Sequence, residues 1–215
     1  MIKKPKAAII NFSTNNLLSI DRAIKFFGFE TTIISEKQDI SSYDLVVLPG
    51  VGAYSQAMKK IKETKLLDVI ETAIVQDKNL LSICLGMQLL FEESEEFGST
   101  KGIGYFKGKV ESFKKFDSEF NTFVGWNRIN FINEKFNQET LENENLILNS
   151  SYYFVHSFCV QNSSQSEIKG ISNNGSTSFI SIIKKDNVIA TQFHPEKSGK
   201  AGIKLLEKLL KPIIS

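Results

Sequence analysis

Short apolar runs alternate with longer amphipathic stretches through the first half of the chain. The runs that have the length and content of buried strands are 6–10, 30–34, 45–48 and 80–83. Apolar residues at helical spacing separate these runs over 17–27 and 54–76, and a break is expected near 62–65. The alternation is typical of βαβ units. It predicts an α/β fold with an open, mostly parallel or mixed sheet flanked by helices.

Beyond residue 98 the pattern changes to alternating segments punctuated by glycine. These segments predict an antiparallel addition to the sheet in the second half, and they are 102–110, 126–132, 152–160, 179–183 and 188–193. The polar stretch 133–149 has little periodicity and is expected to be a loop. A final helix is predicted over 200–211. No repeat or linker divides the chain, so we expect residues 1–215 to form one domain.

Composition and charge exclude several classes of protein. Lys and Arg total 26 against 24 for Asp and Glu, and only Arg22 and Arg128 are arginines, which argues against a nucleic-acid binder. The two cysteines are too few for a disulfide framework, so a reduced, cytoplasmic setting is expected. The first apolar run covers only 7–10, too short for an export signal, and no run approaches the ~18 residues of a membrane span.

The strongest chemical signal is a cysteine at the junction of a predicted strand and a predicted helix. Cys84 follows the run 80–83, and a helical pattern extends from Leu85 to about Glu95. This arrangement predicts a nucleophile elbow, a sharp turn whose helix N-terminus favours a thiolate. A buried structural cysteine would fit the same local pattern. Cys159 lies inside an alternating run without a turn signal, and we expect it to be structural.

A cysteine nucleophile needs a base, and the chain has two histidines, His156 and His194. His194 directly follows a predicted strand and precedes Pro195, which favours an extended conformation at His194. Glu196 then lies on the same side of the chain, where its carboxylate could fix the tautomer of the imidazole. A surface histidine beside a solvated glutamate is the alternative, which the combination with Cys84 disfavours.

Two glycines around one residue follow the predicted strand 45–48. Gly50 and Gly52, on either side of Val51, allow backbone conformations that present N–H groups to a developing negative charge. If this strand neighbours the strand before the cysteine, the glycine loop and the N–H of Leu85 would form an oxyanion hole. A simple tight turn is the alternative interpretation.

These segments together resemble the class I glutamine amidotransferases, and within them the glutaminase subunits of imidazole glycerol phosphate synthases from histidine biosynthesis. Six motifs in the family's order, over nearly the whole chain, carry the resemblance: 49–54, 83–90, 94–96 with 102–110, 125–127, 153–157 and 192–199. The resemblance implies the family's fold and a catalytic triad of Cys84, His194 and Glu196. It implies no cofactor and no metal.

The resemblance also implies a reaction. Cys84 would attack the carboxamide carbon of L-glutamine, giving ammonia and a glutamyl thioester that hydrolyses to L-glutamate. The substrate and oxyanion contacts that it implies are Gly50, Val51, Gly52, Leu85, Gln88, Ser157 and Phe158. His156 needs no catalytic role and is expected to be a packed or interface histidine.

Subunits of this family form a heterodimer with a (β/α)8-barrel cyclase, which uses the ammonia to make imidazole glycerol phosphate and aminoimidazole carboxamide ribotide. The resemblance implies such a partner here, with Asn15 and Trp126 at the interface, although a lone tryptophan is more often part of a core. No nucleic acid or membrane partner is expected.

Three departures from the family pattern keep other hypotheses open. Ser82 replaces a usual glycine, the segment 11–16 lacks two usual glycines, and 122–124 differs from the usual Pro-His-Met. Because the last two segments face the synthase in the family, the same glutaminase could serve a paralogous synthase that aminates a cell-surface sugar precursor. A stand-alone cysteine hydrolase, or a binding protein without activity, is a further alternative.

Overall fold

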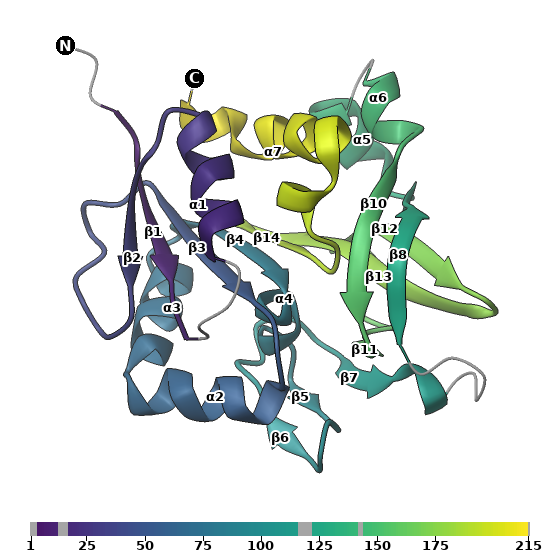
Figure 1. The fold of residues 1–215 in the computed structure, drawn as a ribbon, viewed down its shortest axis with the longest axis horizontal. Coiled ribbons are helices and arrows are strands. Elements are labelled where there is room, and N and C mark those ends of the chain that lie inside the picture. The colour runs from purple at the N-terminus through teal and green to yellow at the C-terminus, as the bar shows by residue number, and fades with distance from the viewer. Residues whose placement is uncertain (1–3, 13–16, 116–121, 142–143, 215) are drawn as a thin grey trace.

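The computed structural model describes residues 4–12, 17–115, 122–141 and 144–214 (Figure 1). Within these residues eight strands form the main sheet, in the order β2 (Glu30–Ile34), β1 (Lys6–Ile10), β3 (Leu45–Gly50), β4 (Asn79–Cys84), β14 (Val188–Thr191), β13 (Thr177–Lys185), β12 (Ile168–Asn174) and β9 (Asn130–Phe131). The pairs from β2 to β14 are parallel, and those from β14 to β9 are antiparallel. The predicted α/β class, with its antiparallel addition, is confirmed.

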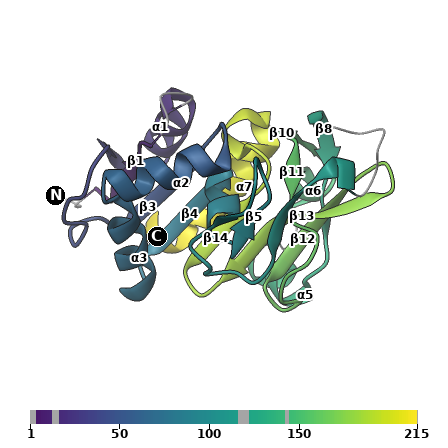
Figure 2. The same cartoon turned by 90° about the horizontal axis from the view of Figure 1, so that it is seen from below.

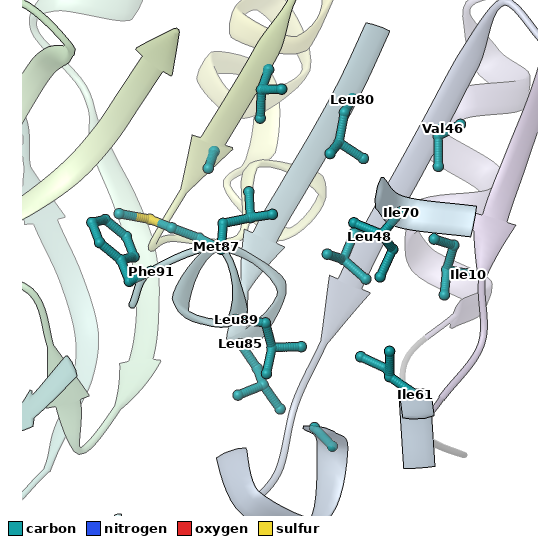
Figure 3. Close-up of a cluster of buried hydrophobic side chains, with 14 of the residues drawn as sticks. Ile10, Val46, Leu48, Ile61, Ile70, Leu80, Leu85, Met87, Leu89 and Phe91 are labelled. Atoms are coloured by element: carbon teal, nitrogen blue, oxygen red, sulfur yellow. The ribbon is translucent and has the colours of Figure 1, made fainter. Parts of the chain in front are cut away.

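Helices cover both faces of the parallel part of the sheet (Figures 1 and 2). One face carries α1 (Leu17–Phe26) and α7 (Gly199–Ile214), and the other carries α2 (Tyr54–Glu63), α3 (Leu66–Val75) and α4 (Leu85–Leu89). Alternate strand residues belong to opposite cores, because successive side chains of a strand point to opposite faces. Figure 3 shows the core between the sheet and helices α2, α3 and α4, in which side chains of the sheet lie beside Ile61 of α2 and Ile70 of α3.

The second half of the chain adds two small sheets beside the main one. The ribbon of β8 (Phe123–Arg128) and β10 (Ser151–His156) is antiparallel, and a four-stranded sheet has the order β11 (Phe158–Cys159), β7 (Lys109–Ser112), β5 (Glu93–Ser94) and β6 (Thr100–Lys101). The remaining elements are the short 3-10 helices η1 (Phe113–Lys115) and η2 (Pro195–Lys197), and the helices α5 (Glu134–Leu141) and α6 (Asn145–Leu148). A third core, rich in aromatic side chains, joins these elements to α7.

Three sequence-based expectations about secondary structure are wrong. Of the segment 102–110, which the sequence predicts to be extended, only the last two residues belong to a strand, β7. The stretch 133–149 contains α5 and α6, and Phe136, Leu141 and Ile147 of these helices are buried in the third core, whereas Leu146 and Leu148 are exposed. The helix that begins at Leu85 ends at Leu89, because the following residues form β5 and pair with β6 and β7. The expected break near 62–65 is confirmed between α2 and α3.

No helix in the described part of the chain is long and apolar enough to span a membrane.

Candidate active site

The strand-to-helix turn at Cys84 lies at the carboxyl end of β4. Cys84 has φ 55° and ψ −111°, a conformation that non-glycine residues rarely adopt, and its side chain is buried. A Cβ atom added to Gly86 would lie 1.8 Å from the carbonyl oxygen of Leu48 in β3. Only glycine at this position lets the first turn of α4 lie so close to the neighbouring strand. The sequence and the sheet together therefore fix the position of the sulfur.

His194 approaches the cysteine from the next strand of the sheet. It follows β14, which pairs in parallel with β4, and its imidazole is almost completely buried. Its backbone N–H donates to the carbonyl oxygen of Tyr153 at 2.9 Å, and its own carbonyl accepts from Ser198 Oγ at 2.6 Å. Its Nδ1–H donates to Glu196 Oε1 at 2.9 Å, and each of these two side chains is only 2% exposed. A surface histidine beside a solvated glutamate is thereby excluded.

The pKa of His194 reflects two opposing influences. Burial lowers it, but the charge of the adjacent Cys84, hydrogen bonds with Cys84 and Glu196, and the charge of Glu196 together raise the pKa well above its usual value of 6.5. Since Nδ1 is occupied by Glu196, Nε2 is the nitrogen left for the sulfur. The environment therefore favours the imidazolium form of His194 next to the sulfur, and a cysteine beside a histidine is the arrangement that serves nucleophilic catalysis.

A cavity of about 240 Å³ opens beside the sulfur. Its lining consists of Val51, Gly52, Cys84, Leu85, Gln88, Glu96, Thr122, Val155, His156, Ser157 and Phe158. The structure thus gathers around one cavity all but one of the residues expected to contact substrate or oxyanion. The exception is Gly50, which pairs with Cys84 across β3 and β4, where an added Cβ would lie 2.5 Å from the ring of Phe12.

Hydrogen bonds join α4 to the segment around Phe158 on the lining of the cavity. Gln88 Nε2 donates to the carbonyl oxygen of Phe158 at 2.9 Å and to Gln192 Oε1 at 3.0 Å. The same Phe158 carbonyl accepts from His156 Nδ1 at 2.9 Å. Ser157 Oγ lies 2.7 Å from the hydroxyl of Thr122. Both N–H groups of Gln88 are therefore used within the protein, so its Oε1 is the atom that it offers to a ligand.

Sequence reasoning missed two polar residues near the sulfur. Glu96 lines the cavity, and its Oε2 accepts the backbone N–H of Tyr54, the first residue of α2, at 2.6 Å. Gln192 Nε2 lies 3.7 Å from Cys84 Sγ. Both residues fall inside segments that resemble family motifs, but neither has a spacing that marks it as part of a site. Only the fold brings them there.

The other cysteine and the other histidine are packed. Burial and the charge of Glu111 raise the pKa of Cys159 to about 12, which suits a structural thiol. Burial lowers the pKa of His156 to about 4, outweighing its hydrogen bond to Phe158. The His156 ring lies within 5.1 to 6.3 Å of four phenylalanine rings and also reaches the cavity.

Of the two residues expected at a partner interface, Trp126 and Asn15, the structure describes only Trp126. Trp126 is 57% exposed on β8, so it is not part of a core, and its ring stacks edge-on against Tyr153 at 5.9 Å. Asn15 lies outside the described residues.

Comparison with known proteins matches residues 8–211 to the model of the family "Glutamine amidotransferase class-I". This chain belongs to the class-I glutamine amidotransferases. It is 41% identical over 209 residues to imidazole glycerol phosphate synthase subunit HisH 1 of Methanococcus maripaludis, a match that covers 96% of this chain and 99% of that protein. It is 40% identical to subunit HisH of Methanocaldococcus jannaschii, over 94% of this chain and 97% of that one.

Solved structures share the fold of this amidotransferase at lower sequence identity. The structure of PurLQS from Thermotoga maritima matches with a TM-score of 0.72 and 19% identity, over 98% of this chain and 99% of that chain. A crystal structure of a glutamine amidotransferase matches with a TM-score of 0.68 and 17% identity, over 95% and 97% of the two chains. The predicted family and its fold are therefore confirmed, and this amidotransferase is an enzyme.

Proposed function

We propose that this amidotransferase is the glutaminase subunit of an imidazole glycerol phosphate synthase in histidine biosynthesis. The observation that carries the proposal is the buried arrangement of Cys84, His194 and Glu196 beside a cavity of small-molecule size. The extensive similarity to HisH subunits supports the same assignment. The proposed reaction is hydrolysis of L-glutamine to L-glutamate and ammonia.

The reaction begins with the thiolate of Cys84, which attacks the carboxamide carbon of glutamine. The carbonyl oxygen then carries negative charge, which the backbone N–H groups of Gly52 and Leu85 would stabilise, since both residues line the cavity. His194 gives its Nε2 proton to the amide nitrogen as the C–N bond breaks, releasing ammonia and leaving a glutamyl thioester. Water then attacks the thioester with His194 as base, which releases glutamate and restores the thiolate.

The amino-acid end of the substrate needs charged and polar partners. Among the lining residues Glu96 is the acidic side chain, and its carboxylate suits the α-ammonium group of glutamine. Gln88 Oε1 is a further acceptor, and the main chain of Ser157 and Phe158 provides contacts to the same end of the substrate. The cavity therefore combines the groups that an α-amino acid with a side-chain amide requires.

Ammonia must reach an acceptor before water protonates it, so we propose a (β/α)8-barrel cyclase as partner in a heterodimer. The exposed apolar side chains of Val124 and Trp126 on β8, 61% and 57% exposed, form a surface suited to that partner. The products of the complex would be imidazole glycerol phosphate and aminoimidazole carboxamide ribotide.

Cys84 and Cys159 are both free thiols, which supports a cytoplasmic enzyme. The HisH relatives named above do not favour a sugar-aminating synthase.

The test measures glutamate formation by this subunit mixed with the cyclase barrel of the same cell. Cys84→Ala should abolish it while the far-ultraviolet circular dichroism spectrum stays unchanged. Cys159→Ala is the matched control, because it removes the other buried thiol and should keep at least half of the activity. Hydrolysis by Cys84→Ala near the wild-type rate would refute the assignment of the nucleophile. Full activity without any response to the barrel would refute the assignment as a synthase subunit.

A further inference from the structure

We propose that Gln192 is a positioning residue that donates a hydrogen bond to Cys84 Sγ and thereby favours the thiolate. The inference rests on the proposed function and assigns a further residue to the same site. Gln192 does not line the cavity, so it acts on the nucleophile and not directly on the substrate. Its side chain is completely buried, which leaves protein groups as its partners.

The sheet places Gln192 next to the cysteine. Thr191 pairs with Ile83 in the parallel register of β14 and β4, so the residues that follow them, Gln192 and Cys84, leave adjacent strands at the same level. The backbone N–H of Gln192 donates to the carbonyl oxygen of Ser181 at 2.9 Å, which fixes its main chain. Its Nε2 then lies 3.7 Å from Cys84 Sγ, within the range of an N–H···S hydrogen bond.

The orientation of the Gln192 amide follows from a chain of hydrogen bonds. The carbonyl oxygen of Phe158 can only accept, so the atom of Gln88 that lies 2.9 Å from it must be Nε2. The second N–H of that Nε2 points to Gln192 at 3.0 Å, where it requires an acceptor, Oε1. Gln192 must therefore turn Nε2 toward the sulfur. Each step depends on donor and acceptor chemistry, which is how amide orientations are assigned.

The sulfur has two polar neighbours with opposite effects on its protonation. The carbonyl oxygen of Val155, 3.8 Å away, accepts from the thiol and so favours the protonated form. The N–H of Gln192 donates to the sulfur and favours the thiolate. Gln192 thus offsets Val155 and supports the pairing with His194. Because Gln88 holds Gln192 in place and also lines the cavity, one side chain links the cavity to the group that faces the sulfur.

The test compares two variants with a matched control. Gln192→Met keeps the length of the side chain and removes the donor. Gln192→Glu keeps an acceptor for Gln88 but turns an oxygen toward the sulfur at neutral pH. Thr191→Val, at the residue next to Gln192, is the control. It removes a different buried hydrogen bond, the one that Thr191 Oγ1 donates to the Phe193 carbonyl at 3.0 Å. The complex with the cyclase barrel is used throughout.

The first measurement is the rate of alkylation by iodoacetamide as a function of pH. On the acidic side of the profile, where only a minor fraction of the sulfur is ionised, Gln192→Met should react about tenfold more slowly than the wild type at the same pH, the effect of losing about 1.4 kcal/mol of thiolate stabilisation. The pH of half-maximal rate should rise, more for Gln192→Glu, while the rate at high pH stays that of the wild type. Alkylation of Cys84→Ala gives the background from Cys159, which is small because its pKa is raised.

The second measurement is the steady-state hydrolysis of glutamine. Because Gln192 does not line the cavity, kcat should fall in both variants while KM stays within about twofold of the wild type, and Thr191→Val should match the wild type in both assays. Alkylation profiles of the two Gln192 variants that coincide with the wild type would overturn the proposal. An equal shift in Thr191→Val would also overturn it, since the effect would then be a general loss of packing. Either result with Cys84→Ala inactive leaves the glutaminase assignment standing.

Discussion

Replacing Glu196 by glutamine should slow the enzyme while leaving its nucleophile in place. The carboxylate lies 2.9 Å from His194 Nδ1, and both side chains are 2% exposed, so solvent does not weaken this hydrogen bond. A hydrogen bond to a charged group contributes about 1.5–3 kcal/mol, against about 1 kcal/mol for a neutral one. The loss of about 0.5–2 kcal/mol corresponds to a roughly 2- to 30-fold lower kcat. If the new amide donates to Nδ1 and so selects the wrong tautomer, the loss approaches about 10⁴-fold.

The pH dependence of the Glu196→Gln variant gives a second, independent readout. The charge of Glu196 is one cause of the raised pKa of His194, so its removal lowers that pKa. The imidazolium that protonates the leaving ammonia is then lost at lower pH, and the alkaline limb of the kcat profile moves toward neutral pH.

The assay follows glutamate formation by the complex with its barrel between pH 6 and 10. Glu63→Gln, an equal change of charge on the exposed surface of α2, is the control and should match the wild type. The orienting role of Glu196 is refuted if kcat stays within about twofold of the wild type and the alkaline limb does not move.

Two further changes test the packing around the site. Gly86→Ala places a Cβ 1.8 Å from the carbonyl oxygen of Leu48, so the free energy of unfolding measured with urea should fall by about 4 kcal/mol or more. An unchanged urea concentration at half-unfolding would contradict the close approach of α4 to β3. His156 is neutral when folded, with its pKa near 4, whereas the unfolded chain protonates it near pH 6.5, so stability falls as pH decreases between these values. Between pH 7 and 5 the wild type should lose about 2 kcal/mol more than His156→Phe. Parallel losses in the two proteins would show that His156 is not the titrating group.

The elements that carry the chemistry could be predicted from the sequence because their signals are local. An apolar run, a cysteine and a helical pattern mark the turn at Cys84, and a proline fixes the relation of His194 to Glu196. Likewise β1 and β3 have both faces buried, so their continuous apolar runs are unambiguous.

The elements that could not be predicted depend on partners far away in the sequence. In helices α5 and α6, Phe136, Leu141 and Ile147 are buried because they pack in the third core with α7, a contact that the local sequence does not show. Strand β12 has polar residues such as Ser172 and Asn174 at buried positions, so its sequence does not alternate between apolar and polar residues. Ser172 can be buried because its Oγ donates a hydrogen bond to the Arg128 carbonyl. Gln192 is a residue of the same kind, since its partner Cys84 is 108 residues distant.

The parallel pairing of β4 with β14 has a consequence for how the active site forms while the chain is being synthesised. β4 and the residues before it can form a sheet with β3 early in synthesis, but the position beside β4 stays vacant until β14 has been made. Domains fold largely as units during translation, N-terminal parts first. A growing chain therefore carries Cys84 long before it carries His194, Glu196 and Gln192, the groups that make the sulfur reactive. The pairing with His194 that serves the attack on glutamine therefore forms only when β14 and the residues after it have been added, although the thiol of Cys84 is present from early in synthesis.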